Sequence, residues 1–310
     1  MPFRIDQKLV VGVSTNALFN LEAEDKIFRE QGLDAYKKFQ KENKDVLLEK
    51  GLAYPFVRRF LNINTIFPEK PVEVVLLSRN SVETGLRVFN SIKSYGLDIS
   101  RAAFTSGRSP FEYIPAFNIS LFLSTNDEDV KNAINRNYPA GRILNTVIHD
   151  DEKDPELRIA FDFDGVLADD AAEQVYQKNE NINEFHEHEV SHSNAPLNPG
   201  LLLRFFQKLS FFQKLESKRA KEDPSYQRVL RTAIITARNA PSHERAVNTL
   251  ESWEVSVDEM FFLGGIEKRR VLEVLKPHLF IDDQITHLDQ SLVDIPLVHI
   301  PFGVINKERS

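Results

Sequence analysis

Carboxylates cluster where two apolar segments of this sequence end. The run RIAFDFDGVLADD places Asp162 and Asp164 two residues apart, and the run HLFIDD ends in Asp282 and Asp283. Neighbouring carboxylates repel one another, so a shared position is tolerable when a cation joins them. Oxygen ligands from carboxylates, a backbone carbonyl, water and a substrate phosphate suit Mg²⁺. These acids therefore predict a magnesium site that handles a phosphorylated small molecule.

The same region carries residues that could transfer a phosphoryl group. Asp162 can attack phosphorus and form an aspartyl-phosphate. Asp164 can protonate the departing oxygen, a contribution of ~10²–10⁴-fold, and can then activate water as a carboxylate. Thr236, at the end of RTAIIT, offers a hydroxyl to the phosphoryl oxygens, and Lys268, in GGIEKRR, offsets their negative charge. We predict that these four residues are catalytic.

Each of these residues also has an ordinary structural interpretation. A lone Asp-x-Asp is a common turn feature, and Thr236 suits a strand end through its β-propensity. Lys268 could be a solvated residue at a helix start, and Asp282 with Asp283 could cap the following helix. Because four such coincidences in this order are less frequent than one site, the constellation favours catalysis.

The elements that must position these residues alternate between apolar strands and amphipathic helices. Short apolar runs predict strands at residues 9–14, 72–78, 119–124, 143–148, 157–162, 231–236, 278–282 and 296–301. Segments such as VETGLRVFNSIKSYG, between two of these runs, have apolar positions three and four apart, as on helices. The alternation predicts an α/β fold with a Rossmann-like parallel sheet. In such sheets ligands bind beyond the carboxyl ends of the strands, where Ser78, Asp162, Thr236 and Asp282 lie.

We expect two lobes, because 310 residues is long for one core. The charged segment DDEKDPE is the expected boundary. It separates an N-terminal α/β lobe (1–150) from a catalytic domain (151–310), which has room for a small cap insertion at about 171–230.

The two lobes resemble copies of one α/β unit. A shift of 158 places Ser78 on Thr236, Arg87 on Arg245 and Gly107 on Gly265, and a shift of 148 places GVSTNALF on AFDFDGVL. The copies differ in charge. Asp162, Asp164, Lys268, Asp282 and Asp283 are replaced in the first half by Ser14, Asn16, Pro110, Ser124 and Thr125. If the repeat is real, the first lobe is a non-catalytic copy. Its strand ends could bind an anionic regulator at Ser14, Asn16, Ser78 and Gly107, or the lobe could be scaffold or a dimer surface.

Composition excludes several other classes. The net charge of −7 and the pI near 5.7 argue against a nucleic-acid partner. Without cysteine there is no disulfide framework and no thiolate zinc site. The N-terminal segment lacks the features of a secretory signal, and no window has the roughly 18 apolar residues of a membrane span. We therefore expect a cytoplasmic protein with no membrane partner.

The motifs DFDGVL, IITA, Lys268 and IDD resemble the four motifs of the haloacid-dehalogenase-like (HAD) phosphohydrolases. Longer stretches, including FHEHEVSHSNAPLNPG, SWEVSVDEMFFLGG and KPHLFIDDQITH, resemble the cytosolic 5′-nucleotidase I family, which prefers AMP. This resemblance implies Mg²⁺-dependent hydrolysis of nucleoside 5′-monophosphates. It implies that Asp162, the Asp164 carbonyl and Asp282 or Asp283 hold the metal. Phe163-Asp164-Gly165 departs from the Gly-Asp-Ala run of animal members, so the preference for base and sugar stays open.

Further residues are predicted to contact the substrate. Near the catalytic motifs these are Gly165, Ala237 and Arg238, and in the cap they are His188, His192 and Asn194. A histidine metal site is not expected, because His186 and His188 lie two apart and would face away from each other on a helix. The aromatic run 201–215 has helical spacing, which is typical of core packing or of a contact in a homo-oligomer.

Two other functions remain open at this stage. The four motifs fit a phosphatase for a phosphosugar or another small phosphomonoester equally well, and only the extended resemblance favours nucleotides. A non-catalytic nucleotide sensor is the third hypothesis, against which the intact set of acids argues.

Overall fold

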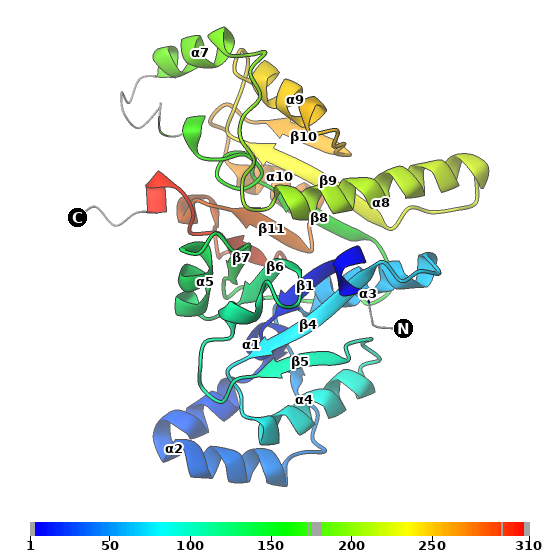
Figure 1. Ribbon diagram of the computed structural model, residues 1–310, viewed down its shortest axis with the longest axis vertical. Coiled ribbons are helices and arrows are strands. Elements are labelled where there is room, and N and C mark those ends of the chain that lie inside the picture. The colour runs from blue at the N-terminus through cyan, green and yellow to red at the C-terminus, as the bar shows by residue number, and fades with distance from the viewer. Residues whose placement is uncertain (1–3, 173, 175–181, 293, 307–310) are drawn as a thin grey trace. The chain divides into compact units, whose positions relative to one another are not determined.

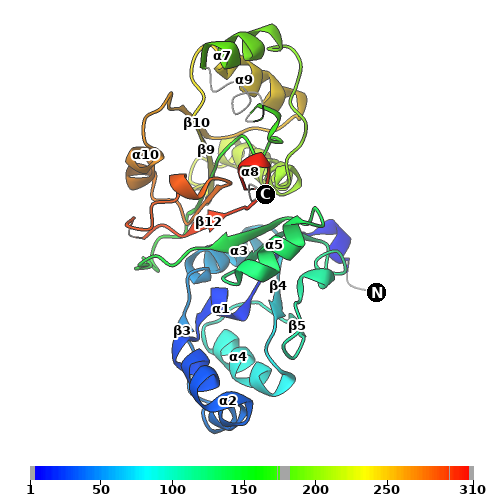
Figure 2. The same ribbon diagram turned by 90° about the vertical axis from the view of Figure 1, so that its left-hand side faces the viewer.

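The computed structural model describes residues 4–172, 174, 182–292 and 294–306. Contacts divide the chain into two compact units, Met1–Ile143 (unit 1) and Leu144–Ser310 (unit 2). Strands and helices alternate along both units (Figures 1 and 2). The predicted α/β fold with a parallel sheet is confirmed.

Unit 1 contains a parallel sheet in the order β7-β6-β1-β4-β5. Its strands are β1 (Leu9–Val13), β4 (Val72–Ser78), β5 (Arg101–Phe104), β6 (Ile119–Ser124) and β7 (Ala140–Ile143), and β2 (Phe19–Asn20) pairs with β3 (Glu49–Lys50) in a separate antiparallel ribbon. Its helices are η1 (Ile5–Gln7), α1 (Thr15–Leu18), α2 (Glu22–Glu42), α3 (Tyr54–Ile66), α4 (Val82–Ser94), η2 (Phe111–Tyr113) and α5 (Asp127–Ile134). Helices α2 and α4 pack side by side (Figures 1 and 2).

Unit 2 contains a parallel sheet in the order β10-β9-β8-β11-β12. Its strands are β8 (Leu157–Phe161), β9 (Leu230–Thr236), β10 (Glu259–Phe262), β11 (Leu279–Asp282) and β12 (Leu297–His299). Its helices are α7 (Ile182–Ser191), α8 (Leu203–Glu222), α9 (His243–Ser252), α10 (Lys268–Leu275), η3 (Ile285–His287) and η4 (Val304–Asn306). Helices α7 and α8 occupy the region between β8 and β9 in which the cap was expected, and α7 packs on α9 (Figure 1).

Burial explains why the central strands form. All seven residues of β4 (VEVVLLS) and all five of β1 (LVVGV) are buried, as expected for strands covered on both faces. In unit 2, Phe205 and Phe206 of α8 are buried, and the Phe206 ring lies 5.2 Å from that of Phe161. The aromatic run 201–215 therefore contributes to the core, although Phe211 is exposed.

The five parallel strands of each unit have the same order, and three of their four pairings have the same register. Leu9 pairs with Val72 in unit 1, and the residues at the aligned positions, Leu157 and Leu230, pair in unit 2. Two further strand pairs match in the same way: Val75↔Arg101 with Ala233↔Glu259, and Gly12↔Phe122 with Ala160↔Phe280. The polar residues that end these strands therefore occupy equivalent positions in the two units.

The sequence prediction was wrong at three parallel strands, and it did not include the antiparallel ribbon of β2 and β3. The predicted strand at 143–148 is instead β7, which ends at Ile143, because Asn145 and Val147 are exposed and lie outside the ladder. Strands β5 and β10 were missed, since each has only four residues and all of them are half-buried. Such short edge strands lack the long apolar run that predicts a buried strand.

Candidate active site

Lys268 joins two aspartates at the ends of neighbouring strands. Asp162 directly follows β8, Asp282 ends β11, and these strands pair in parallel. The Lys268 ammonium lies 2.8 Å from Asp162 Oδ2 and donates to Asp282 Oδ2 at 2.6 Å. The side chains of Lys268, Asp162 and Asp282 are 4%, 6% and 0% exposed, so water screens their charges little. Three of the residues predicted for the site are therefore in direct contact.

The second oxygen of each carboxylate secures the turn after its strand. Asp162 Oδ1 accepts a hydrogen bond from the Phe163 N–H at 2.7 Å, and Asp282 Oδ1 accepts one from the Gln284 N–H at 2.8 Å. One oxygen of each aspartate thus fixes the backbone, and the other faces Lys268.

Asp283 adds a third buried carboxylate. Its side chain packs against Gly165, where the backbone φ is +73° and where a Cβ would collide with Asp283 Oδ2. Glycine is needed here both for this conformation and for space. Asp283 is 2% exposed, and its Oδ1 has no hydrogen-bond partner among the described residues.

The carboxylates of this cluster oppose one another's ionisation. Burial, followed by the negative charges of Asp162 and Asp282, raises the pKa of Asp283 to about 9. Burial also raises the pKa of Asp162 to about 7, although Lys268 acts against it. The pKa of Asp282 is lowered despite its burial, because Lys268 and His287 lie beside it. Asp162 and Asp282 in turn raise the pKa of Lys268, against the effect of burial.

The charge of this cluster fits a divalent cation. Asp162, Asp282 and Asp283 carry three negative charges when ionised, and Lys268 supplies one positive charge. The unpartnered Oδ1 of Asp283 is a hard oxygen ligand of the kind that Mg²⁺ takes. Ligand atoms of Asp162, Asp282 and His287 also lie within 4.8 Å of one another.

His287 was not predicted from the sequence. It lies in η3, and its Nδ1 is 3.2 Å from both oxygens of Asp282. The only available signal was its position five residues after Asp282, in IDDQITH. A histidine donating to Asp282 would orient that carboxylate.

Thr236 ends β9, the strand next to β8. Its hydroxyl is buried and accepts a hydrogen bond from the Arg238 N–H at 3.2 Å. Ala237, between these two residues, is exposed. Thr236 lies at the same end of the sheet as Asp162, as its predicted role requires.

Asp164 is held by Arg238. Nε of the guanidinium donates to Asp164 Oδ2 and Nη2 donates to Oδ1, each at 2.7 Å. The Arg238 Nη1 also donates to Glu189 of α7. Arg238 was predicted to contact substrate, whereas neither Glu189 nor its second partner Arg245 was predicted to belong to the site. Their pairing joins positions 49 and 56 residues apart, which sequence spacing does not reveal.

The cap histidines lie along α7 and just after it. His188 and His192 stack with ring centroids 4.3 Å apart, and His188 Nδ1 is 3.2 Å from Glu189 Oε1. His192 and Asn194 are exposed. His186 lies nearer the strand ends, because its Nε2 is 3.1 Å from Asn239 Oδ1 in the segment after β9. The predicted substrate contacts of His188, His192 and Asn194 stay predictions.

The last two aspartates of RIAFDFDGVLADD have structural partners. Asp169 Oδ2 accepts from the Asn198 amide at 2.9 Å, and Asp170 Oδ2 accepts from the Val304 N–H at 2.7 Å. These bonds secure the segments beside the site.

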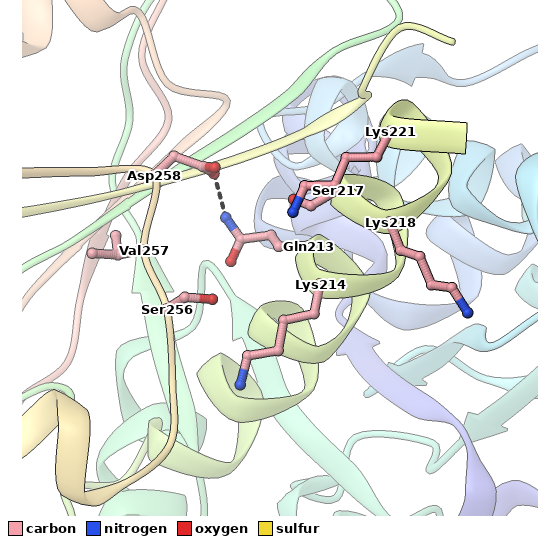
Figure 3. Close-up of a pocket in the computed structure, with 8 residues that line it drawn as sticks. All are labelled: Gln213, Lys214, Ser217, Lys218, Lys221, Ser256, Val257 and Asp258. Atoms are coloured by element: carbon pink, nitrogen blue, oxygen red, sulfur yellow. Dashed lines mark hydrogen bonds between the residues drawn. The ribbon is translucent and has the colours of Figure 1, made fainter. Parts of the chain in front are cut away.

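A pocket of about 460 Å³ lies beside α8 in unit 2 (Figure 3). It is lined by Gln213, Lys214, Ser217, Lys218, Lys221 and residues 256–258. Gln213 donates to Thr232 Oγ1 at 2.8 Å, four residues before Thr236. Since a strand rises about 3.3 Å per residue, this pocket is roughly 13 Å from the carboxyl end of β9 and does not belong to the candidate active site.

Comparison with known proteins identifies a family and a human relative. A family model described as 5′-nucleotidase matches residues 1–307. Human cytosolic 5′-nucleotidase 1B is 30% identical over 288 residues, which cover 91% of this chain and 47% of the relative. The chain thus spans about half the length of that relative. No solved structure matches the chain significantly.

The described helices offer no candidate for a membrane span. Among the residues that the structure describes, none of the helices combines the length and the apolar character that crossing a bilayer requires.

Proposed function

This chain belongs to the 5′-nucleotidase family, and from that membership we propose that it hydrolyses nucleoside 5′-monophosphates to a nucleoside and inorganic phosphate. The proposal assigns the chemistry to unit 2 and treats unit 1 as a non-catalytic copy. The single observation that carries it is the buried cluster in which Lys268 contacts Asp162 and Asp282, with Asp283 beside them.

Two displacements at phosphorus complete the reaction. An oxygen of Asp162 bonds to phosphorus while the bond from phosphorus to the 5′ oxygen breaks, and Asp164 gives its proton to that oxygen. Water then attacks the phosphorus of the aspartyl-phosphate and passes a proton to Asp164. The bond between phosphorus and Asp162 breaks, which releases inorganic phosphate and restores both side chains.

The surrounding residues bind and neutralise the transferred group. Lys268 offsets the negative charge of Asp162 and of the phosphoryl oxygens, and the Thr236 hydroxyl donates to one of those oxygens. Mg²⁺, held by Asp162, the Asp164 carbonyl and Asp282 or Asp283, supplies further positive charge to the same oxygens when bound. The unpartnered, buried Oδ1 of Asp283 supports this ligand set.

The proposed substrate class and cellular location are inferred from the human relative. The name of the human relative, cytosolic 5′-nucleotidase 1B, supports a nucleotide substrate and a cytoplasmic location. We propose AMP as the first nucleotide to test. A homo-oligomer stays a prediction.

Phosphate release from a panel of phosphomonoesters, with Mg²⁺ and after chelation, tests the proposal. We expect hydrolysis of nucleoside 5′-monophosphates that stops on chelation and returns with Mg²⁺. A preference for sugar phosphates over every nucleotide would instead establish a phosphosugar phosphatase. Nucleotide binding without turnover would establish a sensor.

A further inference from the structure

Arg238 lies between the predicted acid/base residue and the cap helix α7. On the basis of the function proposed above, we propose that Arg238 is a positioning residue that holds Asp164 in place and makes that placement depend on Glu189. This role differs from direct contact with substrate, and three sets of contacts favour it.

The first set joins Arg238 to both oxygens of Asp164. The two hydrogen bonds, each 2.7 Å long, run in parallel and therefore fix the plane of the carboxylate as well as its position. The Arg238 side chain is 2% exposed, whereas that of Asp164 is 22% exposed. Asp164 thus keeps an accessible side while the group that orients it is covered.

The second set uses the rest of the guanidinium. Nη1 donates to Glu189 Oε2 and to the Ser242 carbonyl, the latter at 3.2 Å. The rings of Phe163 and Phe185 lie 5.6 and 5.9 Å from the guanidinium carbon. A substrate phosphate would have to displace a carboxylate to bind this group, so positioning explains the contacts better than substrate binding does.

The third set anchors Glu189 itself. Its carboxylate is fully buried, and its Oε1 accepts from Arg245 Nη1 at 2.8 Å. Burial opposes its ionisation, but the guanidiniums of Arg238 and Arg245 hold the Glu189 pKa below its usual range. Glu189 is therefore a fixed negative charge that ties α7 to the segment after β9 and to α9.

A comparison with unit 1 shows which ion pair of this network is common to both units. Arg87 is aligned with Arg245 and pairs at 2.6 Å with the buried Glu24 of α2, the helix that follows β1 much as α7 follows β8. This pair is therefore a feature of the scaffold shared by the two units.

The bidentate pair has no counterpart at the aligned positions of unit 1. Asn80 stands where unit 2 has Arg238, and Asn16 stands where it has Asp164. The Asn16 amide donates instead to Asp25 at 3.1 Å. The pairing of Arg238 with Asp164 therefore accompanies the catalytic acids rather than the fold.

The consequence for the reaction concerns the leaving group. The two hydrogen bonds from Arg238 hold the Asp164 carboxylate in the orientation in which it takes the proton from water in the second step. In the first step Asp164 carries a proton, so one of these two hydrogen bonds must lengthen. The guanidinium still has a carboxylate partner during this change, because its Nη1 donates to Glu189. A substrate with an alkoxide leaving group depends on this adjustment. One with a stable phenolate leaving group does not.

Two substrates and three variants test the inference. The kcat values for AMP and for p-nitrophenyl phosphate are measured for the wild type, Arg238→Lys, Glu189→Gln and the matched control Glu24→Gln, which changes the equivalent buried pair of unit 1. We expect Arg238→Lys to lose about 10- to 100-fold with AMP and less than about threefold with p-nitrophenyl phosphate. Glu189→Gln should lose about three- to tenfold with AMP alone, and Glu24→Gln should leave the ratio of the two rates unchanged.

Equal losses with both substrates, or an unchanged ratio in Arg238→Lys and Glu189→Gln, would overturn the inference. Circular dichroism checks folding, and if Arg238→Lys does not fold, the ratio in Glu189→Gln decides. A wild type that hydrolyses no nucleotide would contradict the proposed function alone. The ratio is then taken with an alkyl phosphate that the wild type does hydrolyse, so the role of Arg238 is judged separately.

Discussion

The clearest contrast between unit 1 and unit 2 lies at the end of one matched pair of strands. Ser124 ends β6, and its hydroxyl accepts a hydrogen bond from the Asn126 N–H at 3.1 Å. Asp282 ends β11 at the aligned position, and its Oδ1 accepts from the Gln284 N–H, also two residues ahead, at 2.8 Å. The serine has no further oxygen, whereas the aspartate has a second one, which binds Lys268.

The ends of β4 and β9 show the same hydrogen bond to the following turn. The hydroxyl of Ser78 accepts from the Asn80 N–H at 3.1 Å, and the hydroxyl of Thr236, at the aligned position, accepts from the Arg238 N–H at 3.2 Å. The turn after each strand thus needs one acceptor, which a small hydroxyl provides as well as a carboxylate does. The turn therefore accepts either type of residue, and the proposed chemistry depends on the second carboxylate oxygen, which the turn does not use.

Replacing the nucleophile should have the largest effect on activity. Asp162→Asn keeps an oxygen to accept from the Phe163 N–H, but its amide cannot attack phosphorus. We expect turnover of AMP to fall about 10⁴-fold or more while the far-ultraviolet circular dichroism is retained. The matched change in unit 1, Ser14→Ala, removes the cap of α1, which accepts from the Ala17 N–H at 3.2 Å. It should cost about 1 kcal/mol of stability and leave turnover unchanged.

Unchanged activity in Asp162→Asn would remove the mechanism. A loss of turnover in Ser14→Ala, beyond what unfolding explains, would end the view of unit 1 as non-catalytic. Phosphate release and urea unfolding, measured on the same preparations, separate these outcomes.

Removing the shared cation should have the next largest effect. Lys268→Met leaves Asp162 and Asp282 without their ammonium, so we expect kcat to fall about 10²–10³-fold. Breaking such a buried pair should also cost roughly 3–5 kcal/mol of unfolding free energy. Added Mg²⁺ should return part of that stability, because it binds the folded state.

The aligned position in unit 1 provides the comparison. Pro110→Ala, at the start of η2, should change the unfolding free energy by no more than about 1 kcal/mol, with or without Mg²⁺. If Lys268→Met were as stable as the wild type and insensitive to Mg²⁺, the acids would not form a shared cation site.

Replacing a glycine by alanine should have the smallest effect on kcat, but the effect should differ clearly between unit 1 and unit 2. Gly165 and Gly107 both have positive φ, +73° and +92°, so alanine at either should cost about 1–2 kcal/mol. The new Cβ at Gly165 meets Asp283, whereas at Gly107 nothing lies within 4 Å. We expect Gly165→Ala to lower kcat about tenfold, through displacement of Asp283, and Gly107→Ala to leave kcat unchanged. Equal kcat values in the two variants would show that Asp283 has no part in the site.

The sequence predicted the strand ends better than it predicted what surrounds them. Long apolar runs located most strands, and the polar residue ending each run located Asp162, Thr236 and Asp282, because periodicity is a local property. Lys268 lies in direct contact with two of these acids.

The rest of the site depends on contacts that local patterns do not carry. Glu189 reads as one more charge on an amphipathic helix, and its burial against two arginines becomes visible only when α7 packs on α9. The pairing of Arg238 was not predicted for the same reason, since its partners lie 49 and 74 residues away. His287 follows the acids closely, but a five-residue spacing in a 3-10 turn matches no periodic signal.

The most direct test of the central claim is a crystal structure with Mg²⁺ and beryllium fluoride, a mimic of the transferred phosphoryl group. We predict that the mimic bonds to an oxygen of Asp162 and that the ion contacts Asp162 together with Asp282 or Asp283. A mimic and an ion bound elsewhere, with Asp162 still paired only to Lys268, would contradict it.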